Sequence, residues 1–268
     1  MTKNITVNQR GFIVNLAQKY GVNDLKTTPS VPATESLMKE DHGSGEVDKT
    51  SYLSLVMAIM YVARFTKPEV LMPTSYLATK CSKPTTTDRG HLMRVLKYLV
   101  GTCDEGLVFK YGIPFNPRMW ADASHHLYND GHGQAGLVIT NGSAIRSTKI
   151  RLATRSSTES ELCALEEAST YVVWYRLLLE DLGVHMSEPM VTYQDNKSSI
   201  IIAIQGATFK RTKHLIGRQS YLRERIQCGD LQLKYCPTKD MLADLMIKPV
   251  TVAVLKRLKG LLSIDMAN

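Results

Sequence analysis

The feature that most constrains the fold is an alternation of strand-like and helix-like segments in the second half of the chain. A short apolar run at residues 119–124 precedes a strongly periodic segment at 161–182, whose apolar residues recur three and four positions apart. Residues 189–194 then read as a strand that enters an apolar helix, and residues 230–236 as a strand before another helix. Strands that alternate with helices predict an α/β fold.

Four carboxylates stand at comparable places in this pattern. Asp122 lies in the first strand, Glu161 in the first turn of the periodic helix, Asp195 just after the second strand, and Asp244 in the helix that follows the third strand. A carboxylate buried alone is costly, so an acid in a strand needs a partner or a metal. Ligands also favour the carboxyl ends of strands in open α/β sheets. We interpret the four acids as candidate metal ligands, although each alone could be a solvated helix end or turn residue.

The ends of the periodic helix can be read from the sequence. Residues 156–159 are Ser-Ser-Thr-Glu, which offers capping hydroxyls followed by an acid, and Gly183 is a stop signal. Glu159 and Glu161 both lie in the first turn, so Glu159 competes with Glu161 for the ligand role and has helix capping as its second possible role. We favour Glu161 as the ligand.

Several motifs resemble the C-terminal end of copia-type LTR retrotransposon polyproteins, where reverse transcriptase is followed by ribonuclease H. The resemblance is carried by Ser156–Leu162, Asp195-Asn196, Arg211–His214, Ala243-Asp244 with Lys248-Pro249 and, upstream, Lys67-Pro68-Glu69 and Arg94–Thr102. It implies a ribonuclease H-like mixed five-stranded sheet with flanking helices over residues 111–268. Residues 1–110 would be a mainly helical thumb or connection segment of reverse transcriptase.

The resemblance also implies a chemistry. Asp122, Glu161, Asp195 and Asp244 would be the catalytic residues and would hold two Mg²⁺ ions, with Mn²⁺ as a substitute, to cut the RNA strand of an RNA–DNA hybrid. In the family, Asp122 would bridge both ions, Glu161 and Asp195 would hold the ion near the leaving group, and Asp244 the ion that bears the attacking water. No Asp-Asp dipeptide occurs, so the polymerase site is absent and polymerase activity is not expected.

The composition favours a nucleic-acid partner. The chain has 33 Lys and Arg against 25 Asp and Glu, a formal charge of +8, and such an excess attracts phosphates. Each basic residue could instead belong to ordinary solvated surface, and helix capping is a compatible second role for Asn196. The residues expected to contact the hybrid are Lys149, Arg151, Asn196, Lys197, Arg211, Lys213, His214 and Arg218.

Two further functions remain open from the sequence. A catalytically inactive remnant would keep the fold and bind nucleic acid or the polymerase part of the same polyprotein, and Ile150, Ser220 and Ile247 depart from the family pattern in its favour. A transposase or integrase on the same general fold is disfavoured by the helix-borne Glu161 between the first and third acids.

The remaining expectations concern organisation and location. Residues 27–49 are rich in turn formers and predict a mobile linker. Helices are expected at about 51–65, 69–81 and 87–99, and an amphipathic terminal helix at 252–259, with a break around residues 110–117. No membrane association is expected, because the apolar runs are too short to span a bilayer. Five cysteines without a Cys-X-X-Cys pair and no secretory signal predict an intracellular protein, cytoplasmic or nuclear and not secreted.

Overall fold

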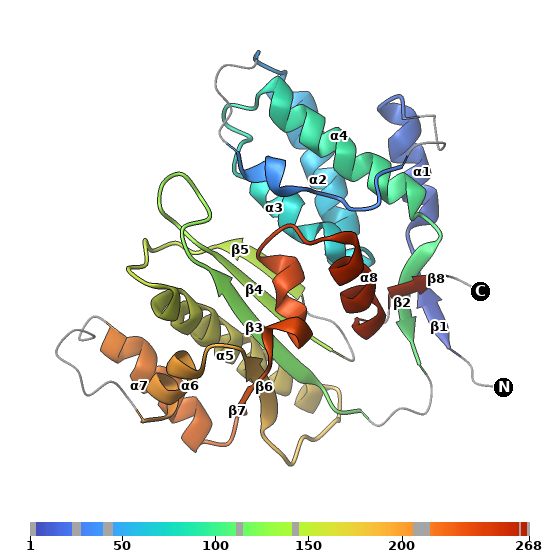
Figure 1. Ribbon diagram of the computed structural model, residues 1–268. Coiled ribbons are helices and arrows are strands. Elements are labelled where there is room, and N and C mark those ends of the chain that lie inside the picture. Colours follow the sequence, from blue (N-terminus) through green and yellow to red (C-terminus); the bar gives the residue numbers. More distant parts are fainter. Residues whose placement is uncertain are drawn as a thin grey trace. The chain divides into compact units, whose positions relative to one another are not determined.

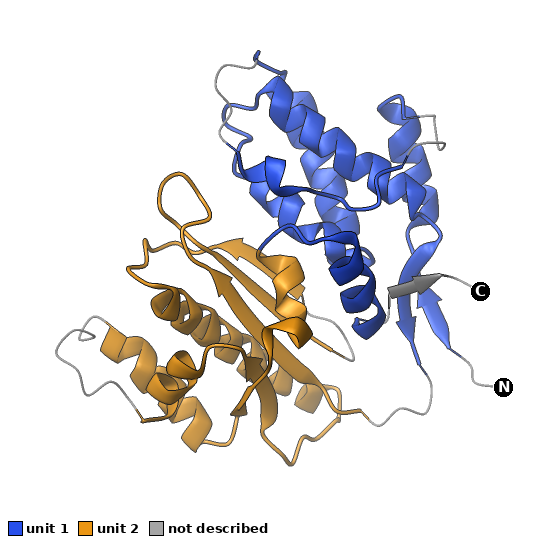
Figure 2. Cartoon of the chain, in the orientation of Figure 1, with its two compact units in different colours: residues 1–114, 248–268 blue, residues 115–247 orange. Residues whose placement is uncertain are grey.

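The chain forms two compact units (Figure 2). A computed structural model describes residues 4–22, 28–39, 45–110, 115–140, 145–205, 215–262 and 264–266 of the 268 residues. Unit 1 comprises residues 1–114 and 248–268, and unit 2 comprises residues 115–247. From the sequence, we expected residues 111–268 to form one domain. In the structure, residues 248–268 group with unit 1.

Unit 1 is mainly helical and has a small antiparallel sheet (Figure 1). Strand β2 lies between β1 and β8, so the last described strand of the chain pairs with one from its first half. This pairing is one reason why the C-terminal residues belong to unit 1. The helices are α1 (Arg10–Lys19), α2 (Lys49–Phe65), α3 (Leu71–Ala78), α4 (Thr86–Gly101) and α8 (Val252–Leu261), and the strands are β1 (Ile5–Val7), β2 (Glu105–Phe109) and β8 (Ile264–Met266).

The prediction of a mobile linker at residues 27–49 is wrong for residues 31–37, and residues 27 and 40–44 of it lie outside the described residues. Val31, Ala33 and Leu37 are buried, and Leu37 belongs to a short 3-10 helix (Glu35–Met38). Turn-forming residues indicate an irregular backbone, but they do not exclude burial of the apolar side chains between them. The four helices expected in this unit form, and the capping box of Thr85 and Asp88 starts α4.

A cluster of buried charges also holds α8 within unit 1. The Nζ atom of Lys67 lies 3.1 Å from Oε2 of Glu105 and 3.7 Å from Oε1 of Glu69. Lys259 of α8 forms an ion pair with the same oxygen of Glu105 and lies 3.4 Å from the hydroxyl of Tyr98. Lys67 is fully buried, and a buried ammonium group requires partners of this kind.

Unit 2 contains the expected mixed five-stranded sheet with flanking helices, in the strand order β5-β4-β3-β6-β7 (Figure 1). Strand β4 pairs antiparallel with β3 and β5, whereas β6 pairs parallel with β3 and β7. The strands are β3 (Arg118–Ser124), β4 (Gln134–Ile139), β5 (Ile145–Lys149), β6 (Met190–Gln194) and β7 (Leu231–Tyr235), and the helices are α5 (Ser157–Asp181), α6 (Lys197–Gln205) and α7 (Ile216–Gln227).

Helix α5 supplies the largest share of the core that covers the sheet. It packs against β3 and β4 through Leu162, Leu165, Ala168 and Val172, and this spacing follows one face of the helix. The hydroxyl of Ser156 accepts the backbone N–H of Glu159 at the start, and Gly183, at a φ of 75°, follows its end. Both helix ends are those predicted from the sequence.

Candidate metal site

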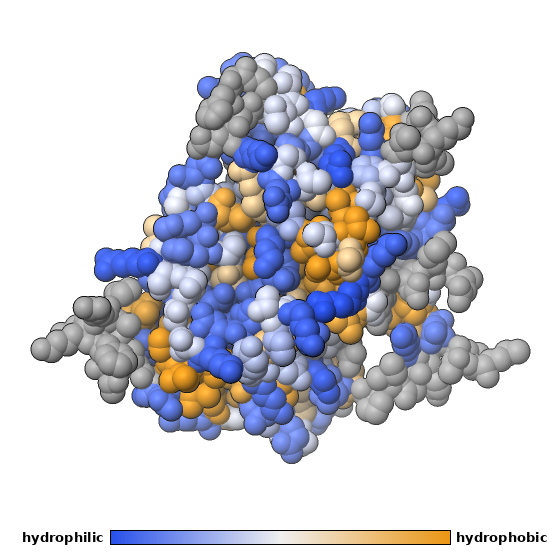
Figure 3. Space-filling view, in the orientation of Figure 1, coloured by the Kyte–Doolittle hydropathy of each residue, from blue (hydrophilic) through white to orange (hydrophobic). Residues whose placement is uncertain are grey.

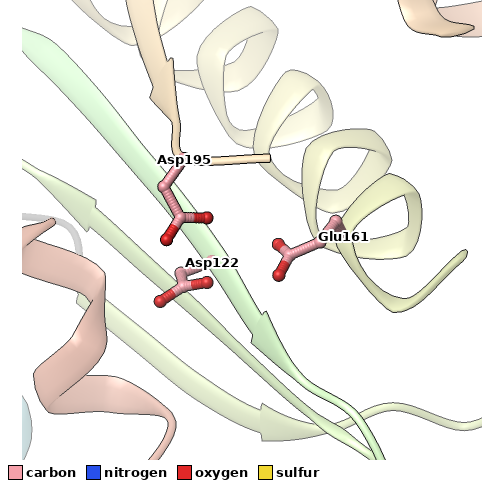
Figure 4. Close-up of side chains that lie close together, drawn as sticks. All are labelled: Asp122, Glu161 and Asp195. Atoms are coloured by element: carbon pink, nitrogen blue, oxygen red, sulfur yellow. The ribbon is translucent and has the colours of Figure 1, made fainter. Parts of the chain in front are cut away.

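Three of the four predicted acids meet at one place in unit 2. One carboxylate oxygen from each of Asp122, Glu161 and Asp195 lies within 4.8 Å of the others. Figure 4 shows the three side chains pointing toward one another from β3, from the start of α5 and from the residue that follows β6. Asp122 and Glu161 are buried, and Asp195 is partly exposed. Two of the three ligand candidates are therefore shielded from solvent and one is not.

Local structure explains how each acid reaches this place. Along β3, Met119, Ala121 and Ala123 face the interior while Asp122 lies on the opposite face of the strand. Strand β6 runs parallel to β3 and ends at Gln194, so the chain delivers Asp195 at the carboxyl edge of the strand next to β3. Helix α5 packs on β3, and Figure 4 shows Glu161, from the start of α5, beside Asp122, so all three acids meet at this edge.

Each of the three acids accepts a hydrogen bond from an uncharged donor. The backbone N–H of Ala123 donates to Oδ1 of Asp122 at 2.8 Å, and the hydroxyl of Thr238 donates to Oδ2 of Asp195 at 2.8 Å. The side-chain amide of Gln194 donates to Oε2 of Glu161 at 3.1 Å. These donors orient the oxygens without adding positive charge, which leaves the negative charge of the group for a cation.

The electrostatics of the group favour a bound proton or cation. Burial raises the pKa of Glu161 well above its usual range, and the charges of Asp122 and Asp195 raise it further. The hydrogen bonds from Gln194 and Ala123 act in the opposite direction and do not compensate. Hard oxygen ligands brought together at this spacing suit Mg²⁺ or a similar divalent cation. The residues present therefore fit the expected metal.

Asp244 lies near this group but outside it, among the residues that the structure describes. It is buried in η5 (Leu242–Met246), a 3-10 helix where an α-helix was expected. Helix η5 packs closely on β4 at Gly136, the residue that pairs with Asp122 across the sheet. A Cβ at Gly136 would stand 2.8 Å from the carbonyl oxygen of Ala243. Ala243, the residue before Asp244, thus contacts Gly136, and Gly136 pairs with Asp122 in the sheet.

A buried chain of hydrogen bonds fixes η5 on the sheet. The hydroxyl of Tyr128 donates to Oε1 of Gln134 at 2.7 Å, and the amide of Gln134 donates to Oγ of Ser147 at 2.7 Å. Ser147 in turn donates to the carbonyl oxygen of Met246 at 2.6 Å. The element that carries Asp244 is thus tied to both β4 and β5.

Glu159 has the capping role that was its second possibility. Its Oε2 accepts the backbone N–H of Arg155 at 2.8 Å, which holds the segment before α5. Glu161 is the acid that joins the carboxylate group. Of the two first-turn acids, the structure therefore brings only Glu161 to Asp122 and Asp195.

The predicted nucleic-acid contacts have mixed surroundings. Arg151 and Lys197 are exposed, whereas Lys149 forms an ion pair with Asp130 and Arg218 one with Glu166. Asn196 caps α6, since its side-chain oxygen accepts the backbone N–H of Ser199 at 3.1 Å. Arg211, Lys213 and His214 lie outside the described residues. Contact of the eight predicted residues with an RNA–DNA hybrid therefore stays a prediction.

Sequence reasoning missed Gln194 and Thr238, which orient two of the acids. A signal for Gln194 was present, because it continues the buried face of β6 after Met190 and Thr192, where an apolar residue would be usual. Thr238 gave no such signal, since it is an exposed residue in η4 (Thr238–Asp240) far along the chain from Asp195.

Comparison with known proteins identifies homologues over most of the chain. The Pol polyprotein of transposon RE2 from Arabidopsis thaliana is 28% identical over 254 residues, which are 91% of this chain and 17% of that polyprotein. The corresponding polyprotein of TNT 1-94 from Nicotiana tabacum is 27% identical over 209 residues, 77% of this chain and 16% of its own length. The chain is a homologue of copia-type retrotransposon Pol polyproteins. It spans about a sixth of the length of these Pol polyproteins.

The chain is also similar to a shorter protein, secreted RxLR effector protein 161 of Plasmopara viticola. It is 35% identical over 131 residues, which are 46% of this chain and 89% of that protein. No family model matches the chain.

Solved structures resemble parts of the chain. LC11 ribonuclease H1, solved with an RNA/DNA hybrid, covers 49% of this chain and 94% of its own at 13% identity and a TM-score of 0.37. A foamy viral protease-reverse transcriptase, solved with double-stranded DNA, covers 76% of this chain at 12% identity and a TM-score of 0.43. Unit 2 has the mixed five-stranded sheet with flanking helices that the sequence resemblance implied for a ribonuclease H-like fold.

The sequence led us to expect no membrane association, and the hydropathy of the helices is relevant to that expectation. Within the described parts of the chain, no helix is long and apolar enough to cross a bilayer. The face in Figure 3 is largely hydrophilic, and its apolar residues form separate patches.

Proposed function

We propose that this chain is a divalent-metal-dependent ribonuclease H that hydrolyses the RNA strand of RNA–DNA hybrids. The observation that carries the proposal is the convergence of Asp122, Glu161 and Asp195, whose oxygens lie within 4.8 Å of one another at the edge of a mixed sheet. Homology to retrotransposon Pol polyproteins supports the same conclusion.

The four acids would together be the protein ligands of two Mg²⁺ ions. Bound ions would activate the attacking water and stabilise the leaving oxygen in an in-line displacement at phosphorus. By the family resemblance, Asp122 would share its carboxylate with both ions; it lies on β3, the central strand of the sheet, which contacts both α5 and η5. Asp244 would complete the ligand set from η5. Asp195, which is partly exposed, would face the incoming substrate phosphate.

The positive charge that attracts the hybrid is concentrated in unit 1. By sequence, residues 1–114 and 248–268 contain 18 Lys and Arg against 11 Asp and Glu, whereas residues 115–247 contain 15 against 14. The formal charges are therefore +7 for unit 1 and +1 for unit 2. We infer that unit 1 supplies much of the long-range attraction to phosphate, while Arg151, Asn196 and Lys197 contact the hybrid near the acids.

The first unit would be the thumb or connection segment of a reverse transcriptase and would support the polymerase part of the same polyprotein. The relatives that the chain matches are about six times longer, which fits a role as one part of a larger protein. An intracellular reaction, in the cytoplasm or nucleus, fits the free cysteines of the described residues.

A second candidate is a nucleic-acid-binding remnant without catalysis. Two observations favour this remnant: Asp244 lies outside the group of three acids, and the cations of Lys149 and Arg218 already pair with acids of this chain. Such a protein would bind the hybrid and leave it intact.

Labelled RNA–DNA hybrid with Mg²⁺ separates the candidates. The purified chain should cut the RNA strand and leave duplex DNA intact, and Asp122→Asn should abolish cutting while keeping hybrid binding. Tight binding without cleavage in Mg²⁺ or Mn²⁺ would select the remnant. Loss of both activities in a folded chain would reject both candidates.

A further inference from the structure

Gln194 occupies an unusual place for a polar side chain. It ends β6, its side chain is fully buried, and it immediately precedes Asp195. Burial of a primary amide is unfavourable unless its donors and acceptors are satisfied. The contacts of this amide therefore indicate what it does in the site.

The amide oxygen of Gln194 holds the turn that presents Asp195. Oε1 accepts the backbone N–H of Asp195 at 2.7 Å and the backbone N–H of Asn196 at 3.1 Å. Asn196 then caps α6 through its own side chain. The path from strand to helix is thus fixed on both sides of the third acid.

The amide nitrogen of the same side chain holds the second acid. Nε2 donates to Oε2 of Glu161 at 3.1 Å, across 33 positions of sequence. One rigid, planar group therefore links a ligand on α5 with the backbone of a ligand after β6. A Lys or Arg at this position would also donate, but its charge would compete with a metal for the same carboxylates. An amide orients the acids and leaves their charge unchanged.

We propose that Gln194 is a positioning residue that sets the affinity of the site for divalent cations by fixing Glu161 and Asp195 relative to each other. The inference rests on the proposed function. Groups that hydrogen-bond to metal ligands typically change metal affinity or activity by about 10- to 100-fold when they are removed. Gln194→Met keeps the length of the side chain and removes all three hydrogen bonds.

Thr192→Val is the matched control. Thr192 lies two positions earlier on the same face of β6 and is equally buried, and its hydroxyl makes no hydrogen bond within the described part of the chain. The control changes the same strand in the same layer without touching an acid. A purely structural effect at β6 should appear in both variants.

The test measures binding of Mn²⁺ alone by calorimetry or electron paramagnetic resonance, on the full-length chain. Gln194→Met should weaken Mn²⁺ binding by about 10- to 100-fold, and Thr192→Val should bind like the wild type. Gln194→Asn, whose amide is too short to reach Glu161, should also weaken binding, and it serves if the Met variant does not fold. Circular dichroism verifies folding.

The possible failures are distinct. Wild-type affinity in a folded Gln194 variant, or an equal loss in Thr192→Val, would overturn the inference and leave the nuclease proposal standing. If the wild type binds no Mn²⁺, or binds it as tightly as Asp122→Asn does, the metal site and the inference fail together.

Discussion

Replacing Gly136 by Ala tests how closely η5 must lie on the sheet. A Cβ at this position would stand 2.7 Å from Cβ of Met246, 2.8 Å from the carbonyl oxygen of Ala243 and 2.8 Å from Cγ2 of Ile247. None of these atoms is the free end of a flexible side chain. To restore an ordinary contact of 3.4 Å to all three atoms, η5 must move by about 0.7 Å, and it carries Asp244 with it.

The expected effect of Gly136→Ala has two parts. Overpacking of a well-packed interior costs typically about 1–3 kcal/mol, which should lower the melting temperature by roughly 2–12 °C. Misplacement by about 1 Å can reduce a rate by about 100-fold, so a shift of this size should reduce cleavage by roughly 10-fold or more. Thermal unfolding and hybrid cleavage measure the two parts separately.

Gly90→Ala is the control for this substitution. Gly90 lies inside α4, and nothing stands within 4 Å of an added Cβ. Alanine should there stabilise the helix by up to about 1 kcal/mol and leave cleavage unchanged. If Gly136→Ala matched the wild type in both stability and cleavage, the packing argument for η5 would be refuted.

Three other substitutions or additions have expected outcomes that unfolding experiments can check. In EDTA, stability should decrease as the pH rises above 4.5, because burial and the charges of Asp122 and Asp195 raise the pKa of Glu161, so that the folded chain keeps a proton which the unfolded chain releases. Glu161→Gln should flatten this dependence; an unchanged slope would contradict the charge repulsion. Glu105→Ala should destabilise unit 1 by about 3 kcal/mol by breaking the buried pairs with Lys67 and Lys259, and urea unfolding that shows no loss would exclude a structural role for the cluster. Burial favours protonation of Glu105, but the hydrogen bond from Lys259 and the charge of Lys67 outweigh it and hold the pKa low, so this contribution is present above a pH of 4.5 and is lost as the pH falls further. Mg²⁺ at about 100 times its dissociation constant should stabilise the wild type by about 2.7 kcal/mol and should not stabilise Asp122→Asn, and equal stabilisation of both would place the ion elsewhere.

Local signals in the sequence were enough to predict the elements that carry the acids. The caps of α5 and the apolar spacing along it define that helix, and Asp195 follows a run whose alternate residues are buried. These features depend on neighbours within a few positions, which is why the sequence alone contains them. The mixed sheet was expected through the family resemblance and is confirmed.

Contacts between distant residues were not predictable in the same way. The bond from Gln194 to Glu161 and the bond from Thr238 to Asp195 depend on how strands and helices pack, and no local pattern specifies either. The same holds for α8, whose amphipathic pattern predicts a helix but not that Lys259 will pair with Glu105 in unit 1. The prediction of a linker at residues 27–49 gave its turn-forming residues more weight than its apolar ones. Val31 and Leu37 are nevertheless buried.

Hydrolysis of a labelled RNA–DNA hybrid in Mg²⁺ tests the central claim most directly, with Asp122→Asn and Asp195→Asn as partners of the wild type. The account predicts that the wild type cuts only the RNA strand and that neither variant does, while all three bind the hybrid. Cleavage by both variants at the wild-type rate would contradict the assignment of the site, and a folded wild type that cuts nothing in Mg²⁺ or Mn²⁺ would contradict the proposed activity.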